Sequence, residues 1–227
     1  MKTYVALIID IVKSRAYGQF DRSDIQVFIN DVIKFLNQVF DKTCELEMVF
    51  SAGDEIQGLF TNIDSAYLYY RLFKMLVSPV EIRGGIGTGE WTIHVKGEAS
   101  TAQDGPAYHL ARQAITQTDP SLGYQLLVNS NNTANMIINS LISSETTLID
   151  AQSYYQNELL LLSEILYPID TINNINQSEL IKIIDLIERK YNLSFYAKIY
   201  QKNKSTLLMT ALANLKNYKP QILNVLV

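Results

Sequence analysis

The chain has 227 residues, a formal net charge of −4 and a hydrophobic content of 48%. This hydrophobic content excludes an intrinsically disordered chain, and the length suffices for one large domain or two small ones. Cys44 is the only cysteine, which excludes an intrachain disulfide framework and a cysteine-based zinc site. We expect a cytoplasmic protein, because a single cysteine fits a reducing compartment and the apolar runs are too short to span a membrane.

The first predicted element is a buried strand that ends at Asp10. The sequence Tyr4-Val5-Ala6-Leu7-Ile8-Ile9-Asp10 places six apolar or aromatic residues before this carboxylate. A continuous apolar run is typical of a strand that is buried on both faces, so Asp10 is expected at an edge of a sheet. Lys13 and Ser14 follow in the next loop and are predicted to face phosphate groups, although they are equally consistent with ordinary loop residues.

A long helix is predicted next. The pattern Ser23-Asp24-Ile25-Gln26 is a capping box, which favours a helix start at this point. Hydrophobic residues then recur at steps of three and four, which predicts an amphipathic helix with one buried stripe. The stripe consists of Ile25, Phe28, Ile29, Val32, Ile33, Leu36, Val39 and Phe40.

A β-hairpin is predicted around Gly53-Asp54-Glu55, because two short apolar runs with alternating burial flank this triplet. Gly53 supplies the positive φ that a tight turn requires. Asp54 and Glu55 are therefore expected at an exposed tip.

The first half of the chain predicts an α+β, ferredoxin-like fold. A second helix is expected from Asp64 or Ser65 to Pro79, and a further strand from Val80 to Thr88. The resulting order is strand, helix, strand, strand, helix, strand. In this βαββαβ topology the first strand lies beside the hairpin, so Asp10 is expected near Asp54.

Asp10 and Asp54 are the candidate metal ligands. Two carboxylates on adjacent strands suggest a shared divalent cation, Mg²⁺ or Mn²⁺, because hard cations prefer oxygen ligands. The alternative is an ordinary turn aspartate together with a helix-capping aspartate.

Four glycines crowd the strand that follows, at positions 84, 85, 87 and 89. Glycine weakens a strand, and in this position it marks either a bulge or a close approach by a ligand or another backbone. A bulge is the favoured interpretation here.

Several short motifs together resemble known families. Asp10-Ile11-Val12 and Gly53-Asp54-Glu55 resemble the two metal motifs of class III nucleotide cyclases, and the second also resembles the core of GGDEF diguanylate cyclases. The segment Arg83–Glu90 resembles the cyclase strand that follows. The hairpin sequence Gly53–Leu59, together with Asp104-Gly105-Pro106-Ala107-Tyr108-His109-Leu110-Ala111-Arg112, resembles the SatD family.

The resemblance implies a cyclase-like domain followed by a helix-turn-helix. Nucleotide binding is then expected from Lys13, Ser14, Gly53, Glu55, His109 and Arg112. In cyclases the matching helix carries an Asn and, four residues later, an Arg that stabilises transition-state charge. Counted from Gly105, these slots hold His109 and Gln113, while Arg112 falls one place early on a different side of the helix. We therefore expect weak or absent cyclase turnover, and whether the protein is an enzyme stays open.

The C-terminal part of the chain, residues 171–227, differs in charge from residues 1–170. We call residues 171–227 the tail. Residues 1–170 hold 11 basic and 20 acidic residues, a net charge of −9, whereas residues 171–227 hold 8 and 3, a net charge of +5. Pro168 and the polar run 173–177 indicate a linker, so we place one domain at 1–170 and a helical domain at 171–227. The charge difference favours an anionic partner for the tail, although a solvated helical surface is an equal alternative.

A helix-turn-helix is the candidate structure of residues 194–215. Residues 194–200 and 204–215 are predicted helices joined by a turn, and Lys202, Lys204, Ser205 and Thr206 are expected to contact DNA phosphates and groove edges. The alternative is a plain helical hairpin used for packing or dimerisation.

Taken together, the sequence favours a cytoplasmic DNA-binding regulator whose cyclase-like domain binds a metal–nucleotide or mediates dimerisation. The alternative is an active metal-dependent enzyme of nucleotide cyclase type that acts on a nucleoside triphosphate. A purely structural dimerisation unit without a ligand is a third hypothesis. A homodimer is expected, and no membrane partner.

Overall fold

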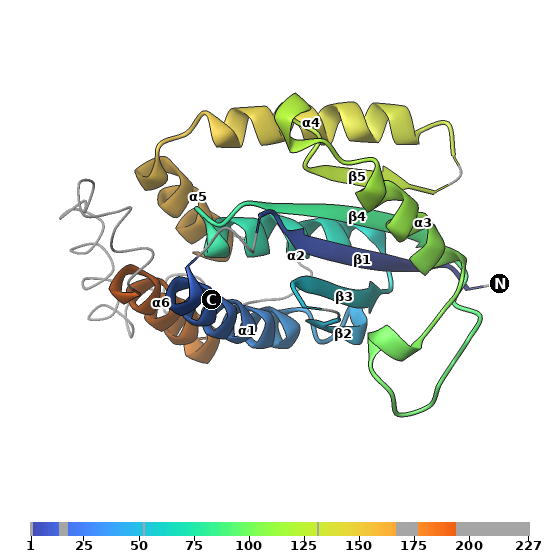
Figure 1. The fold of residues 1–227 in the computed structure, drawn as a ribbon, viewed down its shortest axis with the longest axis horizontal. Helices are drawn as coiled ribbons and strands as arrows, with labels where there is room; N and C mark the ends of the chain where they lie inside the picture. The colour runs from blue at the N-terminus through green and yellow to red at the C-terminus, as the bar shows by residue number, and fades with distance from the viewer. Residues whose placement is uncertain (1, 14–17, 52, 131, 167–176, 194–227) are drawn as a thin grey trace.

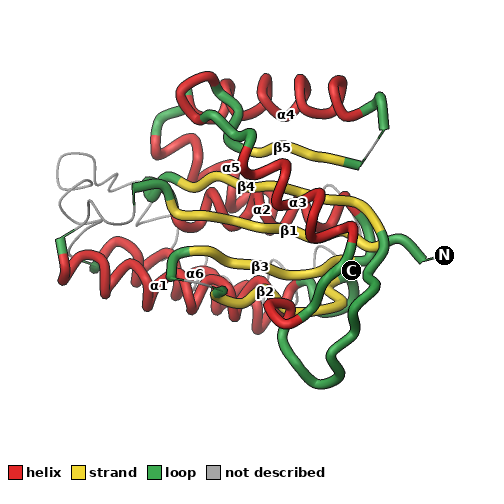
Figure 2. The backbone as a smooth tube through the Cα atoms, turned by 45° about the vertical axis from the view of Figure 1, so that its right-hand side comes forward, coloured by secondary structure: helices red, strands yellow, loops and turns green. Residues whose placement is uncertain are grey.

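A computed structural model describes residues 2–13, 18–51, 53–130, 132–166 and 177–193. These residues form an α+β structure around one five-stranded sheet, with helices on both of its faces (Figures 1 and 2). Among the helices described, none combines the length and the apolar character needed to cross a membrane.

The sheet has the strand order β2-β3-β1-β4-β5. The strands are β1 (Tyr4–Ile11), β2 (Cys44–Phe50), β3 (Glu55–Phe60), β4 (Ile82–Gly89) and β5 (Leu126–Asn129). The first four pair antiparallel, and β5 adds in parallel to β4. This order and connectivity confirm the predicted ferredoxin-like fold, extended by one strand.

The described residues include six α-helices. They are α1 (Gln19–Val39), α2 (Ile63–Val77), α3 (Pro106–Thr116), α4 (Asn135–Asp150), α5 (Tyr154–Leu166) and α6 (Gln177–Asn192). The α1 helix begins four residues before the capping box that was expected to open it, so the helix start predicted at Ser23 was wrong. The cap of α2 is Asn62, whose side-chain oxygen accepts a hydrogen bond of 2.8 Å from the Ser65 N–H.

The central strand β1 is buried on both faces, as its continuous apolar run predicted. Val5, Leu7 and Ile9 join the main hydrophobic core with α1 and α2. Ala6 and Ile8 point the other way and pack with α3 in a second, smaller core. Residues at even positions of β1 therefore lie on the face that α3 covers.

The glycines of β4 allow the backbone of α3 to lie directly on the sheet. A Cβ atom at Gly87 would lie 2.1 Å from the Ala111 nitrogen, and one at Gly85 would lie 2.3 Å from the Ala111 oxygen. The pairing of β4 with β1 runs in one unbroken register from Tyr4–Gly89 to Ile11–Ile82. The expected bulge was therefore wrong, and the close approach of another backbone is what these glycines serve.

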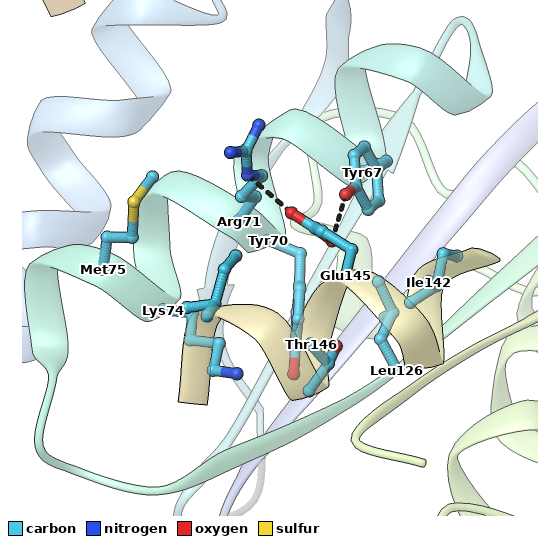
Figure 3. A pocket seen from close by; sticks show the side chains of 10 residues that line it. Tyr67, Tyr70, Arg71, Lys74, Met75, Leu126, Ile142, Glu145 and Thr146 are labelled. Atoms are coloured by element: carbon cyan, nitrogen blue, oxygen red, sulfur yellow. Dashed lines mark hydrogen bonds and ion pairs between the residues drawn. The ribbon is translucent and has the colours of Figure 1, made fainter. Parts of the chain in front are cut away.

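A charged cluster joins α2 to α4 and α5, and Figure 3 shows the part of it between α2 and α4. Arg71 forms an ion pair of 2.8 Å with Glu145 and a second ion pair with Glu164. The Tyr67 hydroxyl donates to the other Glu145 oxygen. Burial raises the pKa of Glu164, the Arg71 guanidinium opposes this rise, and the Glu145 carboxylate adds to it.

The α6 helix packs on α1, although it follows the predicted domain boundary. Ile183, Ile184, Leu186 and Ile187 belong to the main core. Two polar contacts flank them, an ion pair between Arg189 and Asp31 and a 2.7 Å hydrogen bond from Lys182 to Gln38. The separate domain at 171–227 stays a prediction, and the candidate helix-turn-helix at 194–215 lies outside the described residues.

Candidate functional site

Asp10 and Glu55 face each other across two neighbouring strands. The antiparallel register of β1 and β3 makes them direct partners, and the register of β1 and β4 places Arg83 on the other side of Asp10. Residues directly opposite in an antiparallel pair have Cβ atoms roughly 4.5–5.5 Å apart and point to the same face. Glu55 is therefore the cross-strand neighbour of Asp10 at the α3-covered face.

Arg83 holds the Asp10 carboxylate. Its Nε donates a hydrogen bond of 2.7 Å to Asp10 Oδ2, and its Nη2 lies 2.7 Å from the same oxygen. Arg83 belongs to the motif Arg83–Glu90, from which no role for its side chain was predicted. The register between β1 and β4, which a sequence pattern does not reveal, gives it this position.

Arg112 reaches the site from α3 and holds Glu55. Its two terminal nitrogens bind the two carboxylate oxygens, with 2.7 Å between Nη2 and Oε1 and a short contact between Nη1 and Oε2. The hydrogen bond to Glu55 raises the pKa of the Arg112 guanidinium, and the charges of Glu55 and Asp10 act in the same direction. Asp10, Glu55, Arg83 and Arg112 thus form one acid–base cluster.

The structure describes the remaining predicted metal and nucleotide residues except Ser14. Gly53 has the expected positive φ of 76° at the hairpin turn, and Asp54 beside it is half-buried. Ser14 lies outside the described residues. The sharing of a cation by Asp10 and Asp54 stays a prediction, whereas Glu55 is placed beside Asp10 by the register itself.

The two predicted positions on α3 have other partners. His109 is exposed, and its Nε2 lies 3.1 Å from Asp104 Oδ1. Gln113 accepts a hydrogen bond of 3.3 Å from the Asn129 side chain. Of the charged α3 residues singled out in the sequence, Arg112 is therefore the one that takes part in the acid–base cluster.

A large cleft opens where β1 ends and β4 begins. Lys13, with a positive φ of 53°, lines it together with Val12 and Glu81. The volume of the cleft is about 1220 Å³, and other lining residues come from the end of α2 and the start of α5. Val12 and Glu81 are each two residues along the chain from Asp10 and Arg83, but none of the four cluster residues lines the cleft.

The donor set of the cluster fits a divalent cation that arrives together with phosphate. Among the described residues, no three His, Cys, Asp or Glu side chains gather closely enough to form a closed metal cage. Mg²⁺ is usually held by one or two carboxylates plus substrate phosphates, with water completing its shell. Asp10 and Glu55 meet that requirement, and the two arginines offer charge partners for phosphate oxygens.

Fold and site together define a ferredoxin-like α+β domain with an acid–base cluster at the end of its central strand. The chain belongs to the SatD family, whose family model matches residues 4–210.

Solved structures with a similar fold include cyclase domains. The guanylate cyclase domain of RhGC from Catenaria anguillulae, solved in complex with GTP, is 12% identical with a TM-score of 0.45, covering 60% of this chain and 82% of that one. The catalytic core of a rhodopsin-guanylyl cyclase with converted specificity, in complex with ATPαS, is 13% identical with a TM-score of 0.43, covering 60% and 81%. The GGEEF domain of a diguanylate cyclase from Vibrio cholerae is 12% identical with a TM-score of 0.39, covering 58% and 85%. No curated protein sequence matches this chain.

Proposed function

We propose that this protein is a cytoplasmic DNA-binding regulator whose cyclase-like domain senses a nucleotide together with a divalent cation. The observation that carries the proposal is the acid–base cluster, in which two carboxylates from adjacent strands are each held by an arginine from another element. A metal–nucleotide can replace both ion pairs of this cluster. Its cation binds the carboxylates, and its phosphates bind the guanidinium groups.

Each residue of the cluster has a defined role in this proposal. When bound, the Mg²⁺ or Mn²⁺ ion supplies charge neutralisation between the carboxylates and the phosphate oxygens. Asp10 and Glu55 hold the cation, while Arg83 and Arg112 turn to the phosphates. Lys13 and the cleft that it lines receive the rest of the nucleotide in this proposal. The sequence also predicts contacts to the metal–nucleotide from Asp54, Gly53, Ser14 and His109, and these stay candidates.

Binding is proposed in preference to turnover because of Gln113. The cyclase resemblance assigns this slot to a transition-state arginine, and a neutral amide there removes a charge stabiliser. Losing one such group typically lowers the rate by a factor on the order of 10²–10³. For binding without turnover, the two carboxylates and the two arginines are sufficient.

A nucleotide panel tests the proposal. ATP and GTP are titrated with Mg²⁺ or Mn²⁺ into the full chain, and binding is followed by thermal shift and calorimetry. We expect stabilisation only when nucleotide and cation are both present, about 2.7 kcal/mol at a hundredfold excess over Kd. That corresponds to roughly 5–10 °C in Tm for a chain of this length.

Matched carboxylate variants locate the binding. Asp10→Asn and Glu55→Gln are expected to abolish the shift, because each removes a cation ligand. Glu47→Gln is the control, since Glu47 lies exposed on the other strand of the same hairpin. Absence of any shift with the wild-type chain, or loss of the shift in the Glu47 variant alone, contradicts the proposal.

The second candidate function is catalysis, and the position of Arg112 favours it. Although one place early in sequence, this guanidinium lies in the cluster and is in a position to stabilise developing phosphate charge. Chromatography of the same reactions distinguishes the two functions. Cyclic nucleotide formation that Asp10→Asn and Arg112→Gln both abolish would replace sensing by an active cyclase.

DNA binding by the tail is tested separately. We expect Lys202 and Lys204 to contact phosphate, so the Lys202→Ala/Lys204→Ala variant should lower the salt dependence of log K by about 2. Polarisation titrations on the gene's own upstream DNA measure this slope, with exposed Lys42→Ala as the control. Equally poor binding by wild type and variant at low salt removes the DNA-binding claim. A homodimer would present two such helices to half-sites about one helical turn apart.

A further inference from the structure

The two arginines of the acid–base cluster use most of the oxygen atoms that a cation needs there. Arg83 directs Nε and Nη2 to a single oxygen of Asp10, Oδ2, each at 2.7 Å. Arg112 binds both carboxylate oxygens of Glu55. Three of the four carboxylate oxygens therefore accept hydrogen bonds from a guanidinium group, whose planar fork matches a carboxylate.

In each of these ion pairs the arginine is the more exposed partner. The side chains of Asp10 and Glu55 have 21 and 17% of their surface exposed, whereas those of Arg83 and Arg112 have 39 and 50%. The carboxylates are thus the shielded partners. A cation that arrives from solvent has to displace positive charge before it binds them.

The formal charges of the cluster cancel, because two carboxylates face two guanidinium groups. A divalent cation that entered alone would leave excess positive charge at a part-buried site, where water screens it less than in bulk solution. A cation that enters with phosphate groups brings compensating negative charge. Each guanidinium group then exchanges a carboxylate for a phosphate oxygen. The cluster therefore opposes a free cation and accepts a cation that is paired with an anion.

This exchange of partners needs only the rotation of side chains. The backbone of α3 lies so close to Gly85 and Gly87 that a Cβ atom at either glycine would meet Ala111 backbone atoms at 2.3 and 2.1 Å. Such close packing fixes the position of the next residue, Arg112. Its side chain is half exposed, so the guanidinium group can turn away from Glu55 while the helix stays in place.

We propose that Arg83 and Arg112 form an autoinhibitory gate, which keeps a free divalent cation from Asp10 and Glu55 until a polyphosphate anion draws the guanidinium groups away. The inference rests on the proposed function, in which these carboxylates hold the cation, and it adds the reason why the cation needs the anion. Binding of cation and anion is then coupled, and each raises the affinity of the other by the same factor. Removing one guanidinium group lets the cation bind alone.

Titration of the full chain with Mn²⁺ alone tests the gate, with binding followed by loss of the electron paramagnetic resonance signal of free Mn²⁺. We expect Arg83→Gln and Arg112→Gln to bind Mn²⁺ at least about tenfold more tightly than wild type. Arg112→Lys keeps the positive charge, so its affinity should stay close to that of wild type. In Glu55→Gln/Arg112→Gln the gain should disappear, because a cation ligand is missing.

Arg189→Gln is the matched control. Arg189 pairs with Asp31 outside the cluster, and the exposed fractions of the two side chains, 47 and 27%, resemble those of the cluster pairs. This variant also removes one positive charge, so a general charge effect would appear in it equally.

Equilibrium dialysis with labelled inorganic pyrophosphate tests the part of the anion. In the presence of Mn²⁺, Arg112→Gln should retain less pyrophosphate than wild type, because it lacks a phosphate partner.

Tighter Mn²⁺ binding in both cluster variants, with cooperative melting curves and no gain in Arg189→Gln, supports the gate. An equal gain in Arg189→Gln overturns it, as do cluster variants that bind Mn²⁺ no better than wild type. The nucleotide panel separates this failure from failure of the proposed function. If wild type binds Mn²⁺ with ATP or GTP while the cluster variants show no gain, the gate is wrong and sensing stands. If the cluster variants gain Mn²⁺ binding and no nucleotide stabilises wild type, the gate stands and nucleotide sensing is wrong.

Discussion

Asn139 of α4 binds both backbone polar groups of Val128 in the edge strand β5. Its Oδ1 accepts the Val128 N–H at 2.7 Å, and its Nδ2 donates to the Val128 C=O at 3.0 Å. The amide thereby replaces a neighbouring strand at the edge of the sheet, where exposed backbone groups invite pairing with another chain. Asn37 of α1 does the same for Met48 at the irregular part of β2, with distances of 3.1 and 2.9 Å.

Replacing the first of these amides should destabilise the protein. Asn139→Leu removes two hydrogen bonds and leaves two backbone groups without their partner, so we expect a loss of about 2 kcal/mol. Urea unfolding followed by circular dichroism measures it. Asn192→Leu, at an exposed position near the end of α6, should change stability by less than about 0.5 kcal/mol. Equal stability of Asn139→Leu and wild type would show that water substitutes for the side chain.

The contact between α3 and β4 depends on Gly87. A methyl group there would meet the Ala111 nitrogen at 2.1 Å and the Ala107 oxygen at 2.2 Å. Because these are backbone atoms that no rotamer change can move, Gly87→Ala is expected to cost more than about 2 kcal/mol. Gly18→Ala is the control, since a Cβ at Gly18 has nothing within 4 Å. A small effect at Gly87 would mean that α3 shifts away from the sheet, and Arg112 would then lose Glu55.

Stability should fall with rising pH because of Glu164. A folded-state pKa above the ordinary value of 4.5 means that the folded protein binds this proton more tightly than the unfolded chain. The free energy of unfolding therefore decreases as the pH rises from about 4.5 through the raised pKa. Glu164→Gln should flatten this part of the stability–pH curve, measured by urea unfolding from pH 4.5 to 7.5. A Glu164→Gln variant with the wild-type slope would contradict the assignment.

Cys44 should be unreactive in the folded protein. Burial raises the pKa of its thiol to about 12, and the thiol donates a hydrogen bond of 3.1 Å to the Leu46 oxygen. Since the thiolate is the reactive form, alkylation at pH 8 should be on the order of 10³ slower than for a free thiol. Iodoacetamide labelling with and without urea, read by mass spectrometry, compares the two states. Rapid labelling of the folded chain would indicate that β2 opens at its first residue.

Much of the fold followed from local patterns. The apolar run before Asp10 specified a strand buried on both faces, because such a composition is stable only between two covering layers. The order of predicted strands and helices specified the ferredoxin-like topology, since connection rules leave few alternatives. Gly53 indicated the hairpin turn, because a tight turn requires a positive φ. Its φ of 76° agrees with that prediction.

The site itself depended on tertiary structure. Asp10, Glu55, Arg83 and Arg112 come from four different elements, and strand register decides which of them meet. A shift of one residue turns the side chains of a strand to the opposite face. The sequence therefore pointed to Asp54 as the carboxylate near Asp10, whereas the strand register makes Glu55 its direct partner.

The role of Arg112 shows the same division most clearly. The sequence predicted Arg112 as a nucleotide contact but not as the transition-state arginine, because it falls one position before the expected slot. Only the packing of α3 onto the glycines of β4 brings its guanidinium to Glu55. The sequence by itself therefore determined the elements, their order and the family, because these depend on residues close together along the chain. The tertiary structure decided which charged groups become partners, because that depends on register and helix placement between segments far apart in sequence.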